Sequence, residues 1–281
     1  MSEGSTTVAA TEPVGRPRVE ARELAAVGDR CRLAYRLDGP VDAPVLVLSN
    51  SLGTALEMWA PQLDALAARF RVLRYDGRGH GASDAPPGAY SLDRLGRDVV
   101  ELLDALGLGR VHFCGLSLGG MLGQWLAVRA PERIERLVLA NTAAYMGPPA
   151  GWQARIDTVR RDGMGAVAEA TMERWFTAAF RAGSPGAVAA VRDRLLATSA
   201  EGYAGCCAAI RDMDLRPTAP LVARPTLLVA GAADPSTPPE RSEEIARAIG
   251  AAARVVTLPA AHLSNVERPD DFTRAVLDFL A

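Results

Sequence analysis

One segment of the chain has the residue types and spacing of an activated serine. Ser117 stands in the run GLSLGG, which follows an apolar stretch of strand character and opens a stretch of helical character. A serine in such a turn stands clear of the sheet, at the positive end of the following helix. Glycine is needed at Gly115 and Gly119, because side chains there would collide with the neighbouring backbone. One alternative is that the GxSxG spacing occurs here by chance. A phosphate-binding GxGxxG loop does not fit, because Ser117 stands where the second glycine of that motif must be.

This serine needs a base, and the chain offers three histidines. A hydroxyl group is a poor nucleophile until a base removes its proton. His112 lies within a predicted strand and is interpreted as a packed residue that points away from the reaction. His80 lies in the glycine-rich turn DGRGHG, which we interpret as structural, although it could lie near the pocket. His262 follows the last predicted strand, where the chain order serine, acid, histidine places the base.

The imidazole of His262 needs a carboxylate, which fixes its tautomer and stabilises its charged form. Asp234 follows the apolar run PTLLVA and lies between Ser117 and His262, as the chain order requires. The rival position, at the end of the strand after the nucleophile helix, reads Ala-Asn-Thr and offers no acid. Asp212 and Asp214 are interpreted as surface charges or charges of a helical insertion. Ser117, Asp234 and His262 are therefore the predicted catalytic triad.

An oxyanion hole should add two backbone N–H groups that hold the reacting carbonyl oxygen. Leu118, the residue after the nucleophile, is expected to supply the first. The second is expected from the loop SNSLGT that follows the apolar strand PVLVL, with Leu52 as the donor. This loop often reads His-Gly-x, whereas this chain has Asn50-Ser51-Leu52, so a plain strand-to-helix turn stays open as the alternative.

Strands and helices that alternate along the chain must position these residues. Apolar runs such as PVLVL and PTLLVA are typical of strands buried on both faces of a sheet. The alternation predicts an α/β protein with a mostly parallel sheet and helices on both faces. We expect strands at 23–27, 31–37, 44–48, 71–75, 111–114, 134–140, 225–230 and 254–258. We expect helices at 56–70, 92–106 with Ser91 as cap, 118–129 and 270–280, and one after the capping-box sequence Thr237–Glu240.

The alternation breaks in the middle of the chain. Residues 145–216 have a helical pattern without strands, and Ser184-Pro185 has the residue types of a helix start. We interpret this block as a lid inserted in a core that comprises residues 21–144 and 217–281. Residues 1–20 are polar and contain proline and glycine, so we expect a disordered tail there.

The composition excludes several other classes of protein. The 31 basic residues, all arginine, nearly balance 33 acidic ones, which argues against a nucleic-acid or membrane-surface partner. The absence of lysine excludes a Schiff-base mechanism. The four cysteines have no CxxC spacing, so structural zinc is not expected. Because no signal peptide and no apolar run of transmembrane length is recognised, we expect a cytoplasmic protein.

Taken together, the motifs resemble those of the 3-oxoadipate enol-lactonases of the α/β-hydrolase superfamily, from about residue 30 onwards. GLSLGG and the GRGHG turn are found throughout the superfamily and say little about substrate. SNSLGT, RWFT (Arg174–Thr177) and EGYAGCCAAI (Glu201–Ile210) are more particular to the enol-lactonases. Further matching segments are MWAPQ (Met58–Gln62), ERLVLANTA (Glu135–Ala143) and AHLSNVERP (Ala261–Pro269).

This resemblance implies an α/β-hydrolase fold with an eight-stranded sheet and a helical lid. It implies hydrolysis of 3-oxoadipate enol-lactone in bacterial breakdown of protocatechuate and related aromatics, with no metal or organic cofactor. The substrate carries a carboxylate on a short arm, which the lid or the mouth of the site should recognise. The candidates are Arg155 and Arg174 for the carboxylate, Trp152 and Trp175 for the pocket wall, and Asn50 and Ser51 as further neighbours of the substrate. The arginines could instead be solvated helix charges, and the tryptophans could be lid core.

Three alternatives stay open. The same triad would serve another carboxylesterase or a carbon–carbon bond hydrolase. A dehalogenase or epoxide hydrolase would need an aspartate in place of Ser117, which argues against it. A non-catalytic module that binds small molecules is permitted by the fold, but a complete triad argues against that too. A small-molecule substrate is the expected partner, and the oligomeric state is left open.

Overall fold

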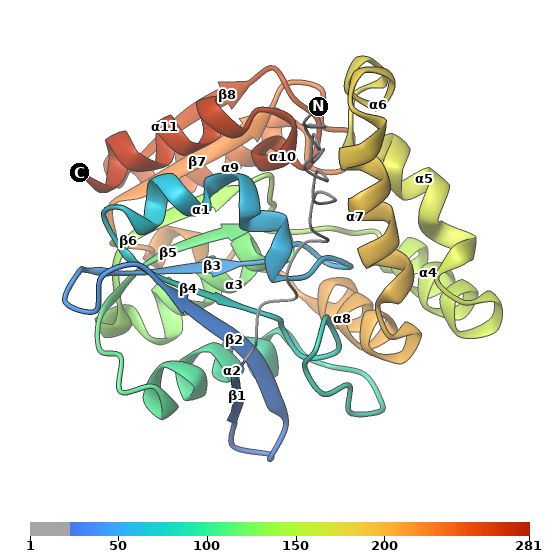
Figure 1. The fold of residues 1–281 in the computed structure, drawn as a ribbon, viewed down its shortest axis with the longest axis horizontal. Helices are drawn as coiled ribbons and strands as arrows, with labels where there is room; N and C mark the ends of the chain where they lie inside the picture. Colours follow the sequence, from blue (N-terminus) through green and yellow to red (C-terminus); the bar gives the residue numbers. More distant parts are fainter. Residues whose placement is uncertain (1–22) are drawn as a thin grey trace, which may run out of the picture.

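The computed structural model describes residues 23–281, so the expected tail at 1–20 lies outside the described residues. Within 23–281, eight strands form one sheet in the order β1-β2-β4-β3-β5-β6-β7-β8 (Figure 1). β2 pairs antiparallel with β1 and with β4, and all other neighbours pair in parallel. The strands are β1 (Glu23–Ala26), β2 (Arg32–Asp38), β3 (Val45–Ser49), β4 (Arg71–Tyr75), β5 (Val111–Leu116), β6 (Ile134–Ala140), β7 (Thr226–Gly231) and β8 (Ala253–Leu258).

The strands in the middle of the sheet are apolar on both faces, as their sequences predict. Leu46, Val47 and Leu48 of β3 are fully buried, and every residue of β7 is buried. Strands covered by helices on both sides need no polar face, which explains the continuous apolar runs. Each observed strand begins and ends within two residues of the predicted bounds.

Two sets of helices cover the two faces of the sheet (Figure 1). Contacts join α1, α10 and α11 into one set and α2 and α3 into the other, and α9 packs on β7 and β8. Helix α2 begins as predicted, with the Ser91 hydroxyl accepting a hydrogen bond from the Arg94 N–H group. The bounds are α1 (Ala60–Ala67), α2 (Leu92–Ala105), α3 (Leu118–Arg129), α9 (Pro239–Ile249), α10 (Ser264–Glu267) and α11 (Pro269–Leu280).

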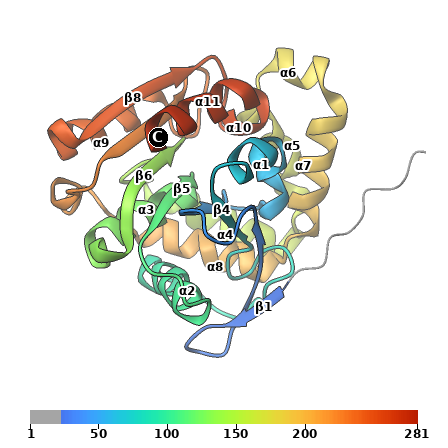
Figure 2. The same ribbon diagram turned by 60° about the vertical axis from the view of Figure 1, so that its left-hand side comes forward.

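Five further helices occupy the chain between β6 and β7, and we refer to them as the lid helices. Figure 1 shows them gathered on one side of the molecule, and in Figure 2 α4 and α8 pass behind its centre. Helices α4 and α8 pack closely against each other, and α5 contacts both α4 and α7. The bounds are α4 (Pro149–Asp162), α5 (Gly165–Trp175), α6 (Ala178–Gly183), α7 (Pro185–Ala197) and α8 (Ala200–Asp212).

Three helix starts differ from the prediction. The segment expected as one helix at 56–70 divides into a 3-10 helix (Leu56–Trp59) and α1. Pro185 stands in the first turn of α7 as expected, but the Ser184 side chain makes no capping hydrogen bond. The Thr237–Glu240 capping box does not form: α9 begins at Pro239 without a side-chain cap. The Thr237 hydroxyl donates to the Asp234 carboxylate at 2.7 Å, and this bond to a charged acceptor holds the side chain towards Asp234.

Candidate active site

Ser117 occupies a strained turn between β5 and α3. Its φ of 58° lies in the left-handed region, which residues other than glycine rarely adopt. A Cβ atom on Gly115 would lie 2.1 Å from the Gly119 carbonyl oxygen, and one on Gly119 would lie 2.2 Å from the Ser49 carbonyl oxygen. The expected collisions at the two glycines are therefore present, and both are with backbone that has no room to move.

The neighbouring strand holds this strained residue in place. The Ser117 N–H group donates to the Ala140 carbonyl at 2.9 Å, and the Thr142 hydroxyl donates to the Ser117 carbonyl at 2.8 Å. The Ser117 carbonyl also accepts the N–H group of Met121, in the first turn of α3. Three hydrogen bonds thus fix the serine backbone, so that its side chain is presented at the carboxyl end of β5.

Asp234 and His262 meet at the same edge of the sheet. They follow β7 and β8, which are parallel neighbours, so the two following loops emerge side by side. The His262 Nδ1–H group donates to Asp234 Oδ2 at 2.8 Å, and both side chains are almost fully buried. A carboxylate only accepts hydrogen bonds, so Nδ1 must carry the proton and Nε2 is left as the basic nitrogen.

The Asp234 carboxylate is surrounded by donors. Oδ2 accepts from the Thr237 hydroxyl at 2.7 Å and the Asn141 amide at 3.1 Å, in addition to His262. Oδ1 accepts from the N–H groups of Ser236 and Thr237. Burial alone would raise the pKa of Asp234, but the charge of His262 and these hydrogen bonds outweigh burial and lower the pKa below its usual value. The carboxylate therefore stays ionised beside the imidazole.

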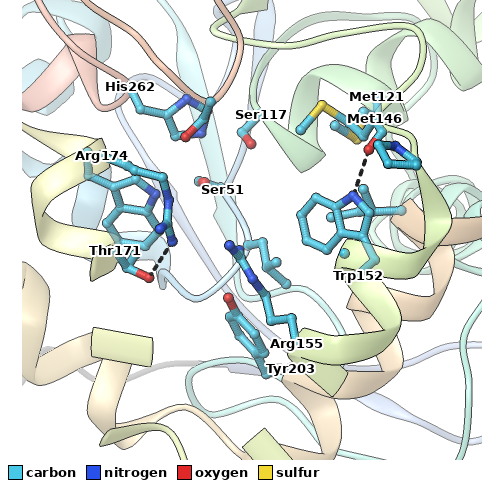
Figure 3. A pocket seen from close by; sticks show the side chains of 16 residues that line it. Ser51, Ser117, Met121, Met146, Trp152, Arg155, Thr171, Arg174, Tyr203 and His262 are labelled. Atoms are coloured by element: carbon cyan, nitrogen blue, oxygen red, sulfur yellow. Dashed lines mark hydrogen bonds between the residues drawn. The ribbon is translucent and has the colours of Figure 1, made fainter. Parts of the chain in front are cut away.

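Ser117 and His262 border one cavity of about 300 Å³ (Figure 3). Among the hydrogen bonds of residues 23–281, none joins the Ser117 hydroxyl to His262. Hydrogen bonds of this kind are often long in a free enzyme and tighten when substrate binds. The arrangement thus presents a hydroxyl and a basic nitrogen to the same small molecule.

The loop that follows β3 is fixed against the serine turn. The Gly119 N–H group donates to the Asn50 carbonyl at 3.1 Å, which places the two expected oxyanion donors, Leu52 and Leu118, on adjoining segments. The Gly53 N–H group donates to Nε2 of His80 at 2.8 Å. No acceptor among the described residues takes the N–H group of Leu52 or Leu118, and Leu52 lines the cavity. Their role as oxyanion donors stays a prediction.

Asn50 does not reach the cavity that its neighbour Ser51 lines. Its side-chain amide donates to the Tyr75 carbonyl at 2.8 Å and accepts from the Trp59 indole at 2.9 Å. Its expected place as a neighbour of the substrate is therefore corrected: the amide faces the protein interior, where it holds the loop. This orientation could not be predicted from the sequence, because a polar residue at a strand end can face the cavity or the interior until its partners are known.

The two other histidines are structural. Burial lowers the pKa of His80. Its Nδ1–H group donates to the Arg78 carbonyl at 3.1 Å, and its Nε2 accepts from the Gly53 N–H group in the loop after β3, which we refer to as the oxyanion loop. His112 packs edge-on against Phe70 and does not border the cavity. His80 thus supports the loop that carries Leu52, a link that the sequence did not predict.

Asp212, the last residue of α8, and Asp214 are exposed charges of the lid segment, so both interpretations apply. Asp212 pairs with Arg211 at 2.7 Å, and Asp214 pairs with Arg216 at 2.6 Å. Asn141, in contrast, stands directly after β6, the other position at which an acid could have stood, and it supports the Asp234 carboxylate by a hydrogen bond. Its side-chain amide donates to Asp234, and its side-chain oxygen accepts from the Ser264 hydroxyl. The sequence signal that could have identified Asn141 is its position directly after β6, the strand next to β7, which precedes Asp234.

The lid helices supply the opposite wall of the cavity. Trp152, Arg155, Arg174 and Trp175 all line it, and Figure 3 shows both guanidinium groups directed towards the space in front of Ser117. Arg155 lies over the Trp152 ring, with its guanidinium carbon 5.0 Å from the ring centre. Tyr203, which the sequence analysis did not single out, completes this wall.

The two cavity arginines, Arg155 and Arg174, have no acidic partner among the described residues. Among the ion pairs of residues 23–281, none includes Arg155 or Arg174, and no acidic residue lines the cavity. Arg174 donates to the Thr171 hydroxyl at 3.1 Å, and burial together with the charge of Arg155 lowers its pKa. Two partly buried positive charges near each other are unfavourable, and a bound anion would relieve this.

The described residues offer no group of histidine, cysteine, aspartate and glutamate side chains arranged to hold a metal ion. Within 23–281, none of the helices combines the length and the apolar character that a membrane span requires.

Comparisons with known proteins agree with this fold. A family model of the α/β-hydrolase fold matches residues 44–269. The 3-oxoadipate enol-lactonase 2 of Acinetobacter baylyi is 43% identical over 87% of this chain and 91% of its own length. The crystal structure of the enol-lactonase from Burkholderia xenovorans is 49% identical, with a TM-score of 0.90 over 92% of this chain and 99% of that one. A hydrolase from Pseudomonas aeruginosa is 53% identical, with a TM-score of 0.91 over 94% and 100%.

The chain therefore belongs to the α/β-hydrolase family. The predicted fold class and the resemblance to the enol-lactonases are both confirmed, and so is the expectation of an enzyme that hydrolyses carboxylic esters.

Proposed function

We propose that this chain hydrolyses 3-oxoadipate enol-lactone to 3-oxoadipate through an acyl-enzyme on Ser117, within bacterial breakdown of aromatic compounds. The observation that carries the proposal is the pair of arginines without acidic partners, Arg155 and Arg174, in a cavity that also holds Ser117 and His262. An ester substrate with a carboxylate of its own fits such a cavity. The enol-lactonase relatives supply the particular lactone.

The first step forms the acyl-enzyme. His262 Nε2 takes the proton of the Ser117 hydroxyl as its oxygen attacks the lactone carbonyl. Asp234 holds the ring by Nδ1 and stabilises the imidazolium that results. The N–H groups of Leu52 and Leu118 then hold the negative oxygen of the tetrahedral intermediate, and a donor of this kind typically contributes roughly 3–4 kcal/mol.

Ring opening follows when the intermediate collapses. The bond between the acyl carbon and the ring oxygen breaks, and the ring oxygen leaves as an enolate. The enolate takes up the proton that His262 gained in the first step, directly or through water, and becomes a ketone, which leaves His262 neutral. An enolate is a better leaving group than an alkoxide, so proton donation by His262 matters less here than in hydrolysis of a simple alkyl ester. Because the ester is cyclic, the whole product stays attached to Ser117.

Hydrolysis of the acyl-enzyme completes the cycle. His262 takes a proton from water, and the hydroxide attacks the acyl carbon in the same oxyanion hole. The bond to Ser117 breaks, the serine oxygen recovers its proton from His262, and the acid is released as a carboxylate. The free enzyme is restored without a cofactor.

The lid wall explains how the substrate would be oriented. Its carboxylate lies on the leaving-group side of the ring, away from the carbonyl that Ser117 attacks. Figure 3 shows Arg155 across the cavity from Ser117, with Arg174 on one side of the cavity and Trp152 on the other, and Trp175 lines the cavity as well. A charge-assisted bond to either arginine contributes about 1.5–3 kcal/mol, which is enough to favour this orientation over its reverse.

The proposal is tested by a substrate panel with purified protein. We expect rapid turnover of the enol-lactone, slower turnover of 4-nitrophenyl acetate, which lacks the carboxylate, and no turnover of a vinylogous diketone from aromatic ring cleavage. A carbon–carbon bond hydrolase would prefer the diketone, and a general carboxylesterase would prefer the aryl ester. Negligible turnover of the enol-lactone beside rapid turnover of either alternative would overturn the substrate assignment.

A further inference from the structure

Glu267, at the end of α10, has a buried carboxylate that the mechanism above does not use. The side chain is 8% exposed, and no ion pair among residues 23–281 includes it. It accepts hydrogen bonds from uncharged donors only. Oε2 accepts the N–H groups of Ala261 at 3.0 Å and Thr177 at 3.3 Å, and Oε1 accepts the Thr177 hydroxyl. A carboxylate is costly to bury, and a hydrophobic residue would fill the space at lower cost, so these bonds need an explanation.

These bonds join two parts of the chain that are distant in sequence. Ala261 directly precedes His262, whereas Thr177 directly precedes α6 among the lid helices. A second link runs parallel to the first: the Leu263 N–H group donates to the Trp175 carbonyl at 3.1 Å. Both chain neighbours of His262 are therefore hydrogen-bonded, directly or through Glu267, to lid residues 175–177.

Both views of the fold show that these residues lie where the lid meets the core. Helix α10 lies beside the end of the lid that carries α5 and α6 (Figure 1, Figure 2). The same α5 carries Arg174 and Trp175 into the cavity. One short stretch of the lid thus provides a cavity arginine and also holds the backbone on which the base is mounted.

We propose that Glu267 is a positioning residue that makes the placement of His262 depend on the lid. The proposal rests on the triad mechanism given above. Asp234 fixes the tautomer and the rotation of the imidazole, whereas Glu267 and the Trp175 carbonyl fix the backbone from which the ring projects. An error of about 1 Å in that backbone lowers the rate by as much as about 100-fold, even when the ring keeps its bond to Asp234. Proton transfer from Ser117 is then efficient only while the lid segment is in place.

The test compares variants that remove the bonds with one that keeps them. We expect Glu267→Leu to lower kcat by about 10- to 100-fold. Glu267→Gln should stay within about threefold of wild type, because its amide oxygen accepts the two N–H groups and its NH₂ group donates to the Thr177 hydroxyl. Thr177→Val should give an intermediate loss. Because both act through one link, the Glu267→Leu, Thr177→Val double variant should be no slower than Glu267→Leu alone.

The readouts must separate positioning from general stability. We would measure kcat and KM for 4-nitrophenyl acetate and the rate at which a fluorophosphonate labels Ser117, both well below the melting temperature of each variant. Both reactions need His262 as the base and neither needs the arginines. Arg192→Gln is the matched control, because it breaks the exposed ion pair with Glu169 within the lid and should leave both rates unchanged.

Two outcomes would overturn the proposal. One is Glu267→Leu protein that melts at a lower temperature but labels at the wild-type rate, which indicates a role in stability alone. The other is equal loss in the Gln and Leu variants, because then the hydrogen bonds are not what matters. Failure of the substrate assignment looks different: wild-type protein would not hydrolyse the enol-lactone, yet fluorophosphonate would label Ser117 and the comparison of variants would stand.

Discussion

On the core side of the cavity, the side chains that support the catalytic groups are hydrogen-bonded within the protein, whereas on the lid side Arg155 and Arg174 have no acidic partner among the described residues. Asp234 has five donors around it, and the Asn50 amide is satisfied by Tyr75 and Trp59. Arg155 and Arg174 border the same cavity without an ion pair among the described residues.

This difference separates chemistry from recognition. Groups that must not move during the reaction are fixed in advance by the core, which is what preorganised catalysis requires. The charges of Arg155 and Arg174 are not neutralised by the protein, so a negatively charged ligand is bound in preference to an uncharged ligand. Changes to the triad on the core side should therefore lower kcat, and changes to Arg155 or Arg174 on the lid side should raise KM for anionic substrates.

The largest expected effect comes from removing the triad on the core side. Ser117→Ala and His262→Ala should each lower kcat by roughly 10⁴- to 10⁶-fold, and Asp234→Asn somewhat less, since the nucleophile and base remain. Initial rates on the enol-lactone measure the loss, and thermal melts check that each variant is folded. Near-wild-type activity of folded His262→Ala would show that another group is the base.

An intermediate effect is expected from the lid side. Arg155→Gln and Arg174→Gln should each raise KM for the enol-lactone by about 10- to 100-fold, the equivalent of one charge-assisted hydrogen bond. Values of kcat/KM for 4-nitrophenyl acetate should change little, since that ester has no carboxylate. Arg160→Gln, which loses an exposed pair with Glu201, is the matched control. If the two cavity variants lowered kcat/KM equally for the enol-lactone and for 4-nitrophenyl acetate, the arginines would not act in recognition of the carboxylate.

The smallest effect concerns the pH dependence of stability. Burial lowers the folded-state pKa of His80, so below about pH 6.5 the unfolded chain binds a proton that the folded chain does not. Stability should therefore fall as the pH drops from about 6.5 towards the folded-state pKa, above the range in which Asp234 becomes protonated. His80→Gln, which keeps an acceptor for the Gly53 N–H group, should weaken this dependence in urea unfolding at pH 7 and pH 5. An unchanged slope would mean that His80 does not contribute.

His112→Gln provides a comparison for that experiment. Burial lowers the pKa of His112 as well, but its side chain is partly exposed and does not support the oxyanion loop. We expect its replacement to change the pH dependence less than that of His80, and to leave kcat unaltered.

The sequence by itself determined the fold class and the places where chemistry could occur. Continuous apolar runs such as PVLVL and PTLLVA predict buried parallel strands because only a sheet covered on both faces can bury them. The GLSLGG run predicts the serine turn because the collisions at Gly115 and Gly119 are local backbone geometry, which a short sequence fully specifies. The candidates Asp234 and His262 then followed from chain order at strand ends, and the structure brings these two into contact.

Only the tertiary structure decided how polar side chains distribute their hydrogen bonds. Thr237 had the spacing of a helix cap and binds Asp234 instead, Asn50 turns inward rather than towards the cavity, and Glu267 joins the lid to the loop of the base. Each of these residues has several acceptable partners within a few residues of itself. For Asn50 and Glu267 the choice depends on which distant donors and acceptors the fold brings within about 3 Å. For Thr237 it depends on how Asp234, three residues away, is held beside His262.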